Sequence, residues 1–249
     1  MTIGLSRTGV PWVANPDGST PGFAWNVIAG CLKRCEWCYA WELAKGRLRE
    51  RYLGNKNNFA GQPSDPFAPR VWHDRWPAPF RRRKPSGIFV VNMGDLFGPW
   101  VPTEYIHDVI QAIWECPQHR FYVLTKFPQR LPEFNPWPEN AWVGATATSF
   151  SEMVEALRQL EKVKAKIKYL SLEPLLSFDP AEGNGQELEL PDWIIVGPLN
   201  GKLVPQHPCK AEWLLGIRQA AQSAGVAIFE KPECARILDR PLRLEWPDA

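Results

Sequence analysis

The sequence predicts an α/β fold in which parallel strands alternate with helices and build a sheet close to a barrel. Its apolar runs are continuous rather than alternating, which is typical of strands that are buried on both faces. Helical segments separate these runs, and they give about seven β units, too many for a small doubly wound sheet. At 249 residues the chain has the length of one (β/α) barrel, so we expect a single domain over residues 1–249.

Apolar runs and helical spacing place the elements in order. We expect residues 1–22 to form an irregular lead-in. Residues 52–87 are expected to form a long Pro-rich excursion, whose length suggests a lid. Strands are predicted at 23–29, 87–91, 120–124, 141–144, 168–172, 193–196 and 226–229. Helices are predicted at 39–51, at 103–115, from Ser149 or Ser151 to 160, and at 211–223.

The segment CLKRCEWC places Cys31, Cys35 and Cys38 at C-x3-C-x2-C spacing, directly after the first predicted strand and Gly30. Three thiolates this close can converge on one metal centre. A zinc site needs a fourth protein ligand nearby, and the next candidates are the distant His73 and Cys116. Three thiolate ligands instead suit a [4Fe–4S] cluster in which one iron stays open to another ligand.

Polar residues follow most of the predicted strands. In parallel α/β folds the carboxyl ends of the strands form the active face, so we expect these residues and the cysteine loop to share it. Lys126 and Glu173 are the strongest candidates, because a charge at the end of an apolar run needs a partner or a ligand. For Thr148 and Asn200 a helix cap or loop hydrogen bond remains an equal alternative. The full set is Cys31, Asp95, Thr125, Lys126, Thr146, Thr148, Glu173, Asn200, Glu230 and Lys231.

Composition narrows the class of protein. A net charge of +2 does not by itself favour nucleic-acid binding. We expect the basic run Arg81–Lys84 to be a solvated connector rather than a phosphate-binding patch. The sequence has no apolar signal core and no apolar stretch of the roughly 20 residues that span a membrane, so we expect a cytoplasmic protein without a membrane partner. Cys116, Cys209 and Cys234 lack paired short spacings and are expected to be buried, inert thiols.

The cysteine motif, with the aromatic Trp37 before its last cysteine, resembles the radical S-adenosylmethionine superfamily. The stretches WNVIAGC, NMGDLFGPWVP, FYVLTKFPQRL, LSLEPLLS and WIIVGPLNG resemble its uncharacterised phage and bacterial branch, so the similarity covers most of the chain. Met93-Gly94-Asp95 departs from the Gly-Gly-Glu segment that is frequent in the superfamily.

The resemblance implies a partial (β/α)6-type, TIM-like barrel with a [4Fe–4S] cluster on Cys31, Cys35 and Cys38. It implies S-adenosylmethionine on the open iron, reductive cleavage to a 5′-deoxyadenosyl radical, and hydrogen abstraction from a substrate. A one-electron donor such as flavodoxin or ferredoxin is the implied partner.

The resemblance also suggests roles for single residues. Trp37 would pack beside the cluster or the adenine, and Met93, Gly94 and Asp95 would receive the methionine ammonium. Lys126, beside Thr125, would pair with the methionine carboxylate. Thr146 or Thr148 would contact the ribose, and Glu173 a ribose hydroxyl or the substrate.

The substrate stays open at this point, with a nucleotide or nucleic acid as one candidate. A function of a different class is a nucleic-acid-binding module whose cysteines hold a structural metal and whose Arg81–Lys84 run contacts phosphates.

Overall fold

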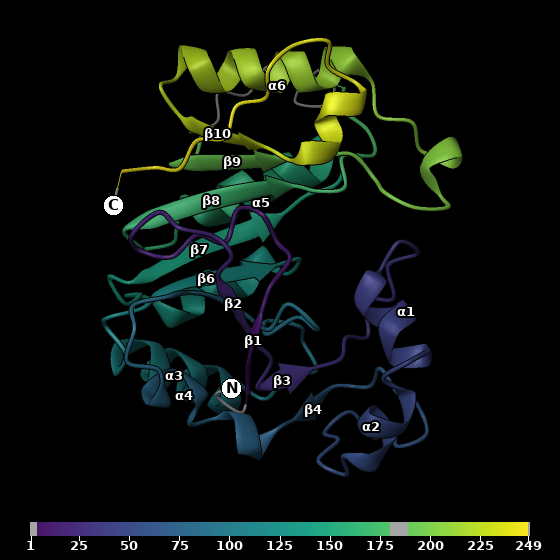
Figure 1. Ribbon diagram of the computed structural model, residues 1–249, viewed down its shortest axis with the longest axis vertical. Helices are drawn as coiled ribbons and strands as arrows, with labels where there is room; N and C mark the ends of the chain where they lie inside the picture. The colour runs from purple at the N-terminus through teal and green to yellow at the C-terminus, as the bar shows by residue number, and fades with distance from the viewer. Residues whose placement is uncertain (1–3, 180–188, 249) are drawn as a thin grey trace. The chain divides into compact units, whose positions relative to one another are not determined.

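Short strands of mostly buried residues run through the first part of the chain, which is drawn as a ribbon in Figure 1. The computed structural model describes residues 4–179 and 189–248 and divides into two compact units. The first unit contains Met1–Phe127 and Trp137–Ala141, and the second contains Pro128–Pro136 and Trp142–Ala249. The predicted single domain stays a prediction.

The main strands of the first unit run in the order β1 (Leu5–Arg7), β2 (Phe23–Trp25), β5 (Gly87–Val90) and β6 (Arg120–Thr125). Strands β2, β5 and β6 are parallel, and β1 is an antiparallel strand beside β2. Helix α4 (Thr103–Trp114) follows β5 and buries the predicted apolar face of Ile106, Val109, Ile110 and Ile113. Strands β5 and β6 and helix α4 therefore confirm the sequence prediction.

The residues around the cysteine motif differ from the prediction in detail. The expected strand over 23–29 is two strands, because β3 (Ile28–Ala29) leaves β2 and pairs antiparallel with β4 (Arg70–Val71). The expected helix over 39–51 breaks at Gly46 into α1 (Tyr39–Lys45) and α2 (Arg49–Gly54). The excursion also holds η1 (His73–Arg75) and α3 (Ala78–Arg81), and β1 lies in the expected irregular lead-in.

Strands β3 and β4 and helices α1 and α2 pack around one small core, and Figure 1 shows them side by side. This core is made of buried apolar side chains from β3, α1, α2 and the residues on either side of β4: Ala29, Ala40, Ala44, Tyr52, Phe67 and Trp72. Cys31, Cys38 and Met93 pack against it. The cysteine motif is thus anchored on its own apolar cluster.

The second unit is an alternation of parallel strands and helices. Its elements are η2 (Pro128–Phe134), β7 (Ala141–Thr146), α5 (Phe150–Leu160), β8 (Ile167–Leu172), β9 (Trp193–Val196), η4 (Val204–Gln206), α6 (Ala211–Ser223), β10 (Ala227–Glu230) and η5 (Pro232–Arg236). Strands β7, β8, β9 and β10 are neighbours in that order and all parallel, and α6 lies along β10 (Figure 1).

These pairings confirm the predicted α/β class with mostly parallel strands. In neither unit do the described strands close into a ring. Parallel pairing also brings the carboxyl ends of neighbouring strands to one edge, which is where most of the predicted polar residues lie. Within residues 4–179 and 189–248, no helix is long and apolar enough to cross a membrane.

Candidate functional site

A close backbone contact fixes the start of the cysteine loop. Gly30 has φ of +103°, and a Cβ atom at this position would lie 2.5 Å from the carbonyl oxygen of Ala68. The Gly30 N–H donates to the Met93 carbonyl at 2.9 Å, and the Cys31 N–H donates to the Phe67 carbonyl at 3.0 Å. Only glycine fits this conformation and this approach, so Gly30 sets where Cys31 points.

Cys31, Cys35 and Cys38 are free thiols and are half-buried. Cys38 caps α1, where its sulfur accepts the Trp41 N–H at 3.4 Å, and the Cys31 sulfur accepts the Lys33 N–H at 3.4 Å. Burial raises the pKa of Cys31 to about 12, with smaller contributions from Asp95, Cys35 and Cys38. Burial also raises the pKa of Cys38. The three sulfurs therefore lie within electrostatic range of one another.

Three thiolates are a donor set that suits a [4Fe–4S] cluster with one open iron. Among the residues that the structure describes, no three His, Cys, Asp or Glu side chains converge closely enough for one metal ion. Thiolates on three different irons of a cubane stand further apart than ligands of one zinc. Arg34 lies between the first two cysteines in the sequence, and its Nη1 is buried without a hydrogen-bond partner. A bound group at the cysteine loop could supply the acceptor that this donor lacks.

Asp95 ties the end of β5 to the end of β6. Its Oδ1 accepts the Thr125 hydroxyl at 2.6 Å and the Phe97 N–H at 3.0 Å, and its Oδ2 accepts the Lys126 N–H at 2.9 Å. Burial raises the pKa of this carboxyl, whereas these hydrogen bonds lower it. Three of about four acceptor positions are thereby used, so one remains on Oδ2 for a ligand.

Lys126, Met93 and Gly94 lie with the cysteine loop in the first unit. Burial raises the pKa of Cys38, and the positive charge of Lys126 opposes this rise as the smallest contribution, so the two groups lie within electrostatic range. Gly94 forms a parallel bridge with Gly30, and Met93 packs against the same core as Cys31 and Cys38. Trp37 is half-buried next to the last cysteine. Nine predicted residues thus belong to the first unit: Cys31, Cys35, Trp37, Cys38, Met93, Gly94, Asp95, Thr125 and Lys126.

Sequence reasoning missed the side chains that hold these segments together. Asn26 donates to Oδ1 of Asn92 at 2.7 Å and accepts the Met93 N–H at 2.8 Å, so it joins the end of β2 to the loop after β5. Arg34 forms an ion pair with Asp65. The sequence does show an asparagine in WNVIAGC and an arginine inside CLKRCEWC, but it does not show which distant residue each one binds.

Thr146 and Thr148 belong to the second unit. Thr146 is the half-buried last residue of β7. Thr148 is buried, and its N–H and hydroxyl both donate to Oε2 of Glu152, at 2.8 and 2.7 Å. Because Ser149 caps α5 through the Glu152 N–H, Thr148 takes part in a helix-start network. Their predicted contacts with a ribose stay predictions.

Glu173, at the end of β8, forms an ion pair with Lys231, which follows β10. This pair supplies the partner that a charge at a strand end requires. Glu230 has a structural role, since it is fully buried and accepts two hydrogen bonds from Arg218 of α6, at 2.6 and 2.5 Å. The predicted ligand contact of Glu173 stays a prediction.

The remaining cysteines are Cys116 of the first unit and Cys209 and Cys234 of the second. Cys116 and Cys234 are buried, as predicted, and Cys209 is half-buried. Burial raises the pKa of Cys116 and Cys209 to about 11 and that of Cys234 to about 12. Thiols that stay protonated near neutral pH are poor nucleophiles.

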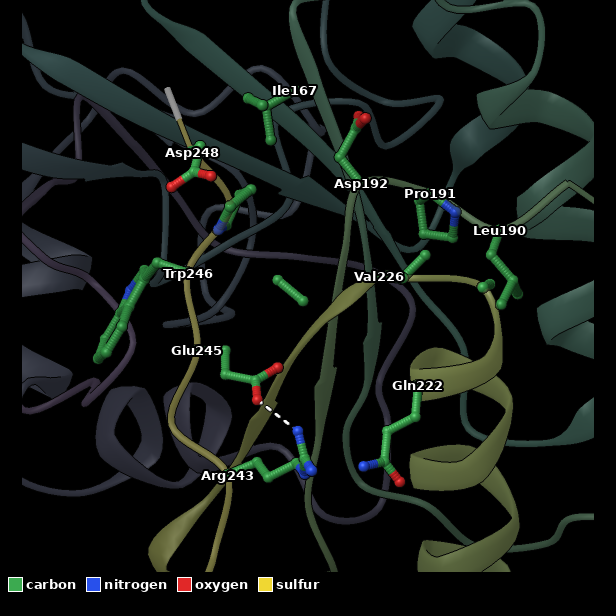
Figure 2. A pocket seen from close by; sticks show the side chains of 14 residues that line it. Ile167, Leu190, Pro191, Asp192, Gln222, Val226, Arg243, Glu245, Trp246 and Asp248 are labelled. Carbon is green, nitrogen blue, oxygen red and sulfur yellow. Dashed lines mark hydrogen bonds and ion pairs between the residues drawn. The ribbon is translucent and has the colours of Figure 1, made fainter.

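An open hollow of about 750 Å³ lies in the second unit (Figure 2). Its wall includes Ile167, Asp192 and Val226, which stand at the amino ends of β8, β9 and β10, and an ion pair of Arg243 with Glu245 at 2.7 Å. Active sites of parallel α/β folds open at the carboxyl ends of their strands. None of the predicted site residues lines this hollow, so we do not assign the chemistry to it.

A family model described as "Protein of unknown function (DUF5131)" matches residues 18–235, which include the cysteine motif and all strands from β2 to β10. The chain belongs to this family. A search of curated proteins finds no match to this DUF5131 member.

Solved structures of spore photoproduct lyase are similar to this DUF5131 chain. A mutant of that enzyme matches with a TM-score of 0.52 and 11% identity, covering 88% of this chain and 78% of the other. A double mutant with bound AdoMet and dinucleoside spore photoproduct matches with a TM-score of 0.45 and 12% identity, covering 82% of this chain and 54% of the other. The first similarity shows a common fold, and at this identity it shows nothing finer.

Proposed function

We propose that this protein is a radical S-adenosylmethionine enzyme with a [4Fe–4S] cluster on Cys31, Cys35 and Cys38. The observation that carries the proposal is a loop of three free thiols, held at the end of a strand and without a fourth ligand for a single ion among the described residues. The shared fold supports it, since spore photoproduct lyase is a radical S-adenosylmethionine enzyme. When bound, the two cofactors supply an electron and a carbon radical that abstracts hydrogen.

The chain's own groups would bind and orient these cofactors. Lys126 supplies a positive charge for the methionine carboxylate. The remaining acceptor position of Asp95 and the backbone of Met93 and Gly94 suit an ammonium group. Trp37 offers a flat apolar surface beside the last cysteine, where it would exclude water from the cluster or the adenine.

Anaerobic reconstitution with iron and sulfide tests the cluster. We expect a brown protein with about four irons per chain, because three thiolates suffice to hold a cubane. Replacing Cys35 with Ala is expected to abolish this loading, and Cys209→Ala, a half-buried cysteine outside the motif, is the matched control. A colourless protein that holds one zinc through the same cysteines would overturn the proposal.

For the substrate we propose a nucleic acid, and the cations beside the cysteine motif support this choice. Between Lys45 and Lys56 the chain has five basic residues and one acidic residue. They belong to α1, α2 and their ends, and Lys45, Arg47, Arg49, Arg51 and Lys56 are all exposed. The other basic run, Arg81–Lys84, precedes β5 and so lies toward the amino ends of the strands, away from the cysteine loop. Phosphate contacts are therefore expected from α1 and α2.

Binding of a fluorescent single-stranded DNA oligonucleotide, measured over a range of salt concentrations, tests this proposal. The triple variant Arg47→Gln/Arg49→Gln/Lys56→Gln is expected to bind at least about tenfold more weakly in low salt. Its salt slope should fall by about two, since each lost phosphate contact removes about 0.7. The matched control, Arg81→Gln/Arg83→Gln/Lys84→Gln, removes the same charge and should bind like the wild type.

Equal loss in both triple variants would contradict a specific contact at α1 and α2. The alternative function, a nucleic-acid-binding module with a structural metal, predicts DNA binding together with a single bound metal and no cleavage of S-adenosylmethionine. Reconstitution separates the two functions.

A further inference from the structure

Arg34 occupies a strained position inside the cysteine motif. Its φ is +57°, in the left-handed region that non-glycine residues seldom adopt. Its guanidinium forms an ion pair with Asp65 and lies over the rings of Trp41, at 5.3 Å, and Phe67, at 5.6 Å. Residues in such conformations persist when their surroundings over-determine them, and they are frequent at functional sites.

Asp65 links Arg34 back to the first cysteine. Its Oδ1 accepts the Phe67 N–H at 2.9 Å, and the Phe67 carbonyl accepts the Cys31 N–H at 3.0 Å. Arg34 and Asp65 keep only 27% and 23% of their side-chain surface exposed, so solvent screens the pair less than it screens a surface ion pair. The contacts form a closed ring from Cys31 through Phe67 and Asp65 to Arg34.

Arg70 binds the backbone on both sides of Asp65. It is fully buried, and its guanidinium donates to backbone carbonyls rather than to a carboxylate. The acceptors belong to Asn55, Pro63, Asp65, Pro66 and Ala68, at 2.6 to 3.3 Å. Five backbone acceptors on one side chain fix the path of residues 63–70, so this part of the excursion is a rigid support for the cysteine loop.

Two contacts place Arg34 beside the segments that carry the thiols. Its guanidinium lies over the ring of Trp41, whose N–H donates to the Cys38 sulfur at 3.4 Å, and over the ring of Phe67, whose carbonyl accepts the Cys31 N–H at 3.0 Å. One of its nitrogens, Nη1, is buried without a hydrogen-bond partner. A buried donor without an acceptor destabilises the protein, so an acceptor supplied by a bound group would stabilise it.

We propose that Arg34 is a positioning residue for the cluster: Asp65 holds its guanidinium, and Nη1 donates to a sulfur of the cluster or of its thiolate ligands. This inference rests on the proposed function. It gives residues 63–70 the role of a support for the cysteine loop, and the predicted lid over residues 52–87 stays a prediction. Hydrogen bonds to cluster sulfurs and nearby positive charge raise the reduction potential, so Arg34 makes the cluster easier to reduce.

The reduction potential of the loaded cluster is the first readout. Arg34→Gln is expected to lower the reduction equilibrium constant by about tenfold, or about 59 mV for a one-electron couple. Arg34→Lys keeps the charge and should recover part of this shift. Asp65→Asn leaves the charge of Arg34 in place, and it should lower the iron content more than the potential.

The protein without iron gives a second readout. Because the ring of contacts is present before the cluster binds, Asp65→Asn should speed hydrogen exchange at the Cys31 amide and alkylation of Cys31 by at least about fivefold, since breaking a partly buried ion pair costs about 1 kcal/mol or more. Arg243→Gln breaks an ion pair with Glu245 in the second unit and is the matched control.

Potential, iron content and exchange rates equal to the wild type in Arg34→Gln and Asp65→Asn would overturn this inference while leaving the proposed function intact. A wild-type protein that takes up no cluster would overturn the proposed function instead. The two failures are therefore distinguishable.

Discussion

Asp95 shows how a residue predicted for ligand binding also organises the site. The sequence placed a carboxylate after a buried strand, but it did not reveal that Thr125, Phe97 and Lys126 would take most of its acceptor positions. Phe97 lies only two residues beyond Asp95, but Thr125 and Lys126 belong to a second strand end, 30 and 31 residues further along the chain. The carboxylate therefore fixes where the Lys126 backbone lies.

Replacing Asp95 with Asn tests this role. The amide nitrogen of Asn would face an N–H or hydroxyl donor, leaving a buried donor unsatisfied, so we expect the free energy of unfolding to fall by about 1.5–3 kcal/mol. Urea unfolding of the protein without iron measures this change. Stability within about 0.5 kcal/mol of the wild type would contradict the three-donor geometry.

At the scale of single elements, strand and helix cores were predictable and their edges were not. Continuous apolar runs located β5, β6, β8 and β9 because burial on both faces requires such runs. The break between β2 and β3 depends on Asn26 and Asn92, which lie 66 residues apart. Local periodicity does not contain such partners, and the pairing of Arg34 with Asp65 escaped prediction for the same reason.

At the scale of single elements, we predict that one ion pair between α6 and β10 stabilises the protein. Arg218 and Glu230 form a two-hydrogen-bond ion pair in which Glu230 is fully buried. Arg218→Met leaves that carboxylate without its partner, so we expect a loss of about 3–5 kcal/mol in the free energy of unfolding.

Thermal or urea unfolding of the Arg218→Met variant measures this loss. The double variant Arg218→Met/Glu230→Leu should recover most of the stability, because an apolar pair of similar volume often replaces a buried ion pair at little cost. A double variant as unstable as the single one would show that the pair itself is not the cause.

Across the whole chain, sequence reasoning captured the class of fold, whereas the cluster on the cysteine loop stays a prediction. Nine of the predicted site residues lie in the same unit as that loop, and the match to the DUF5131 family covers residues 18–235. The substrate was not predictable, since it depends on surfaces assembled from distant segments. The exposed cations of α1 and α2 support the proposal of a nucleic-acid substrate.

The most direct measurement of the central claim is the product formed when the loaded, reduced protein is mixed with S-adenosylmethionine. A radical S-adenosylmethionine enzyme is expected to release 5′-deoxyadenosine and methionine, and Cys35→Ala should release neither. Intact S-adenosylmethionine after mixing with a fully loaded and reduced protein would contradict the account.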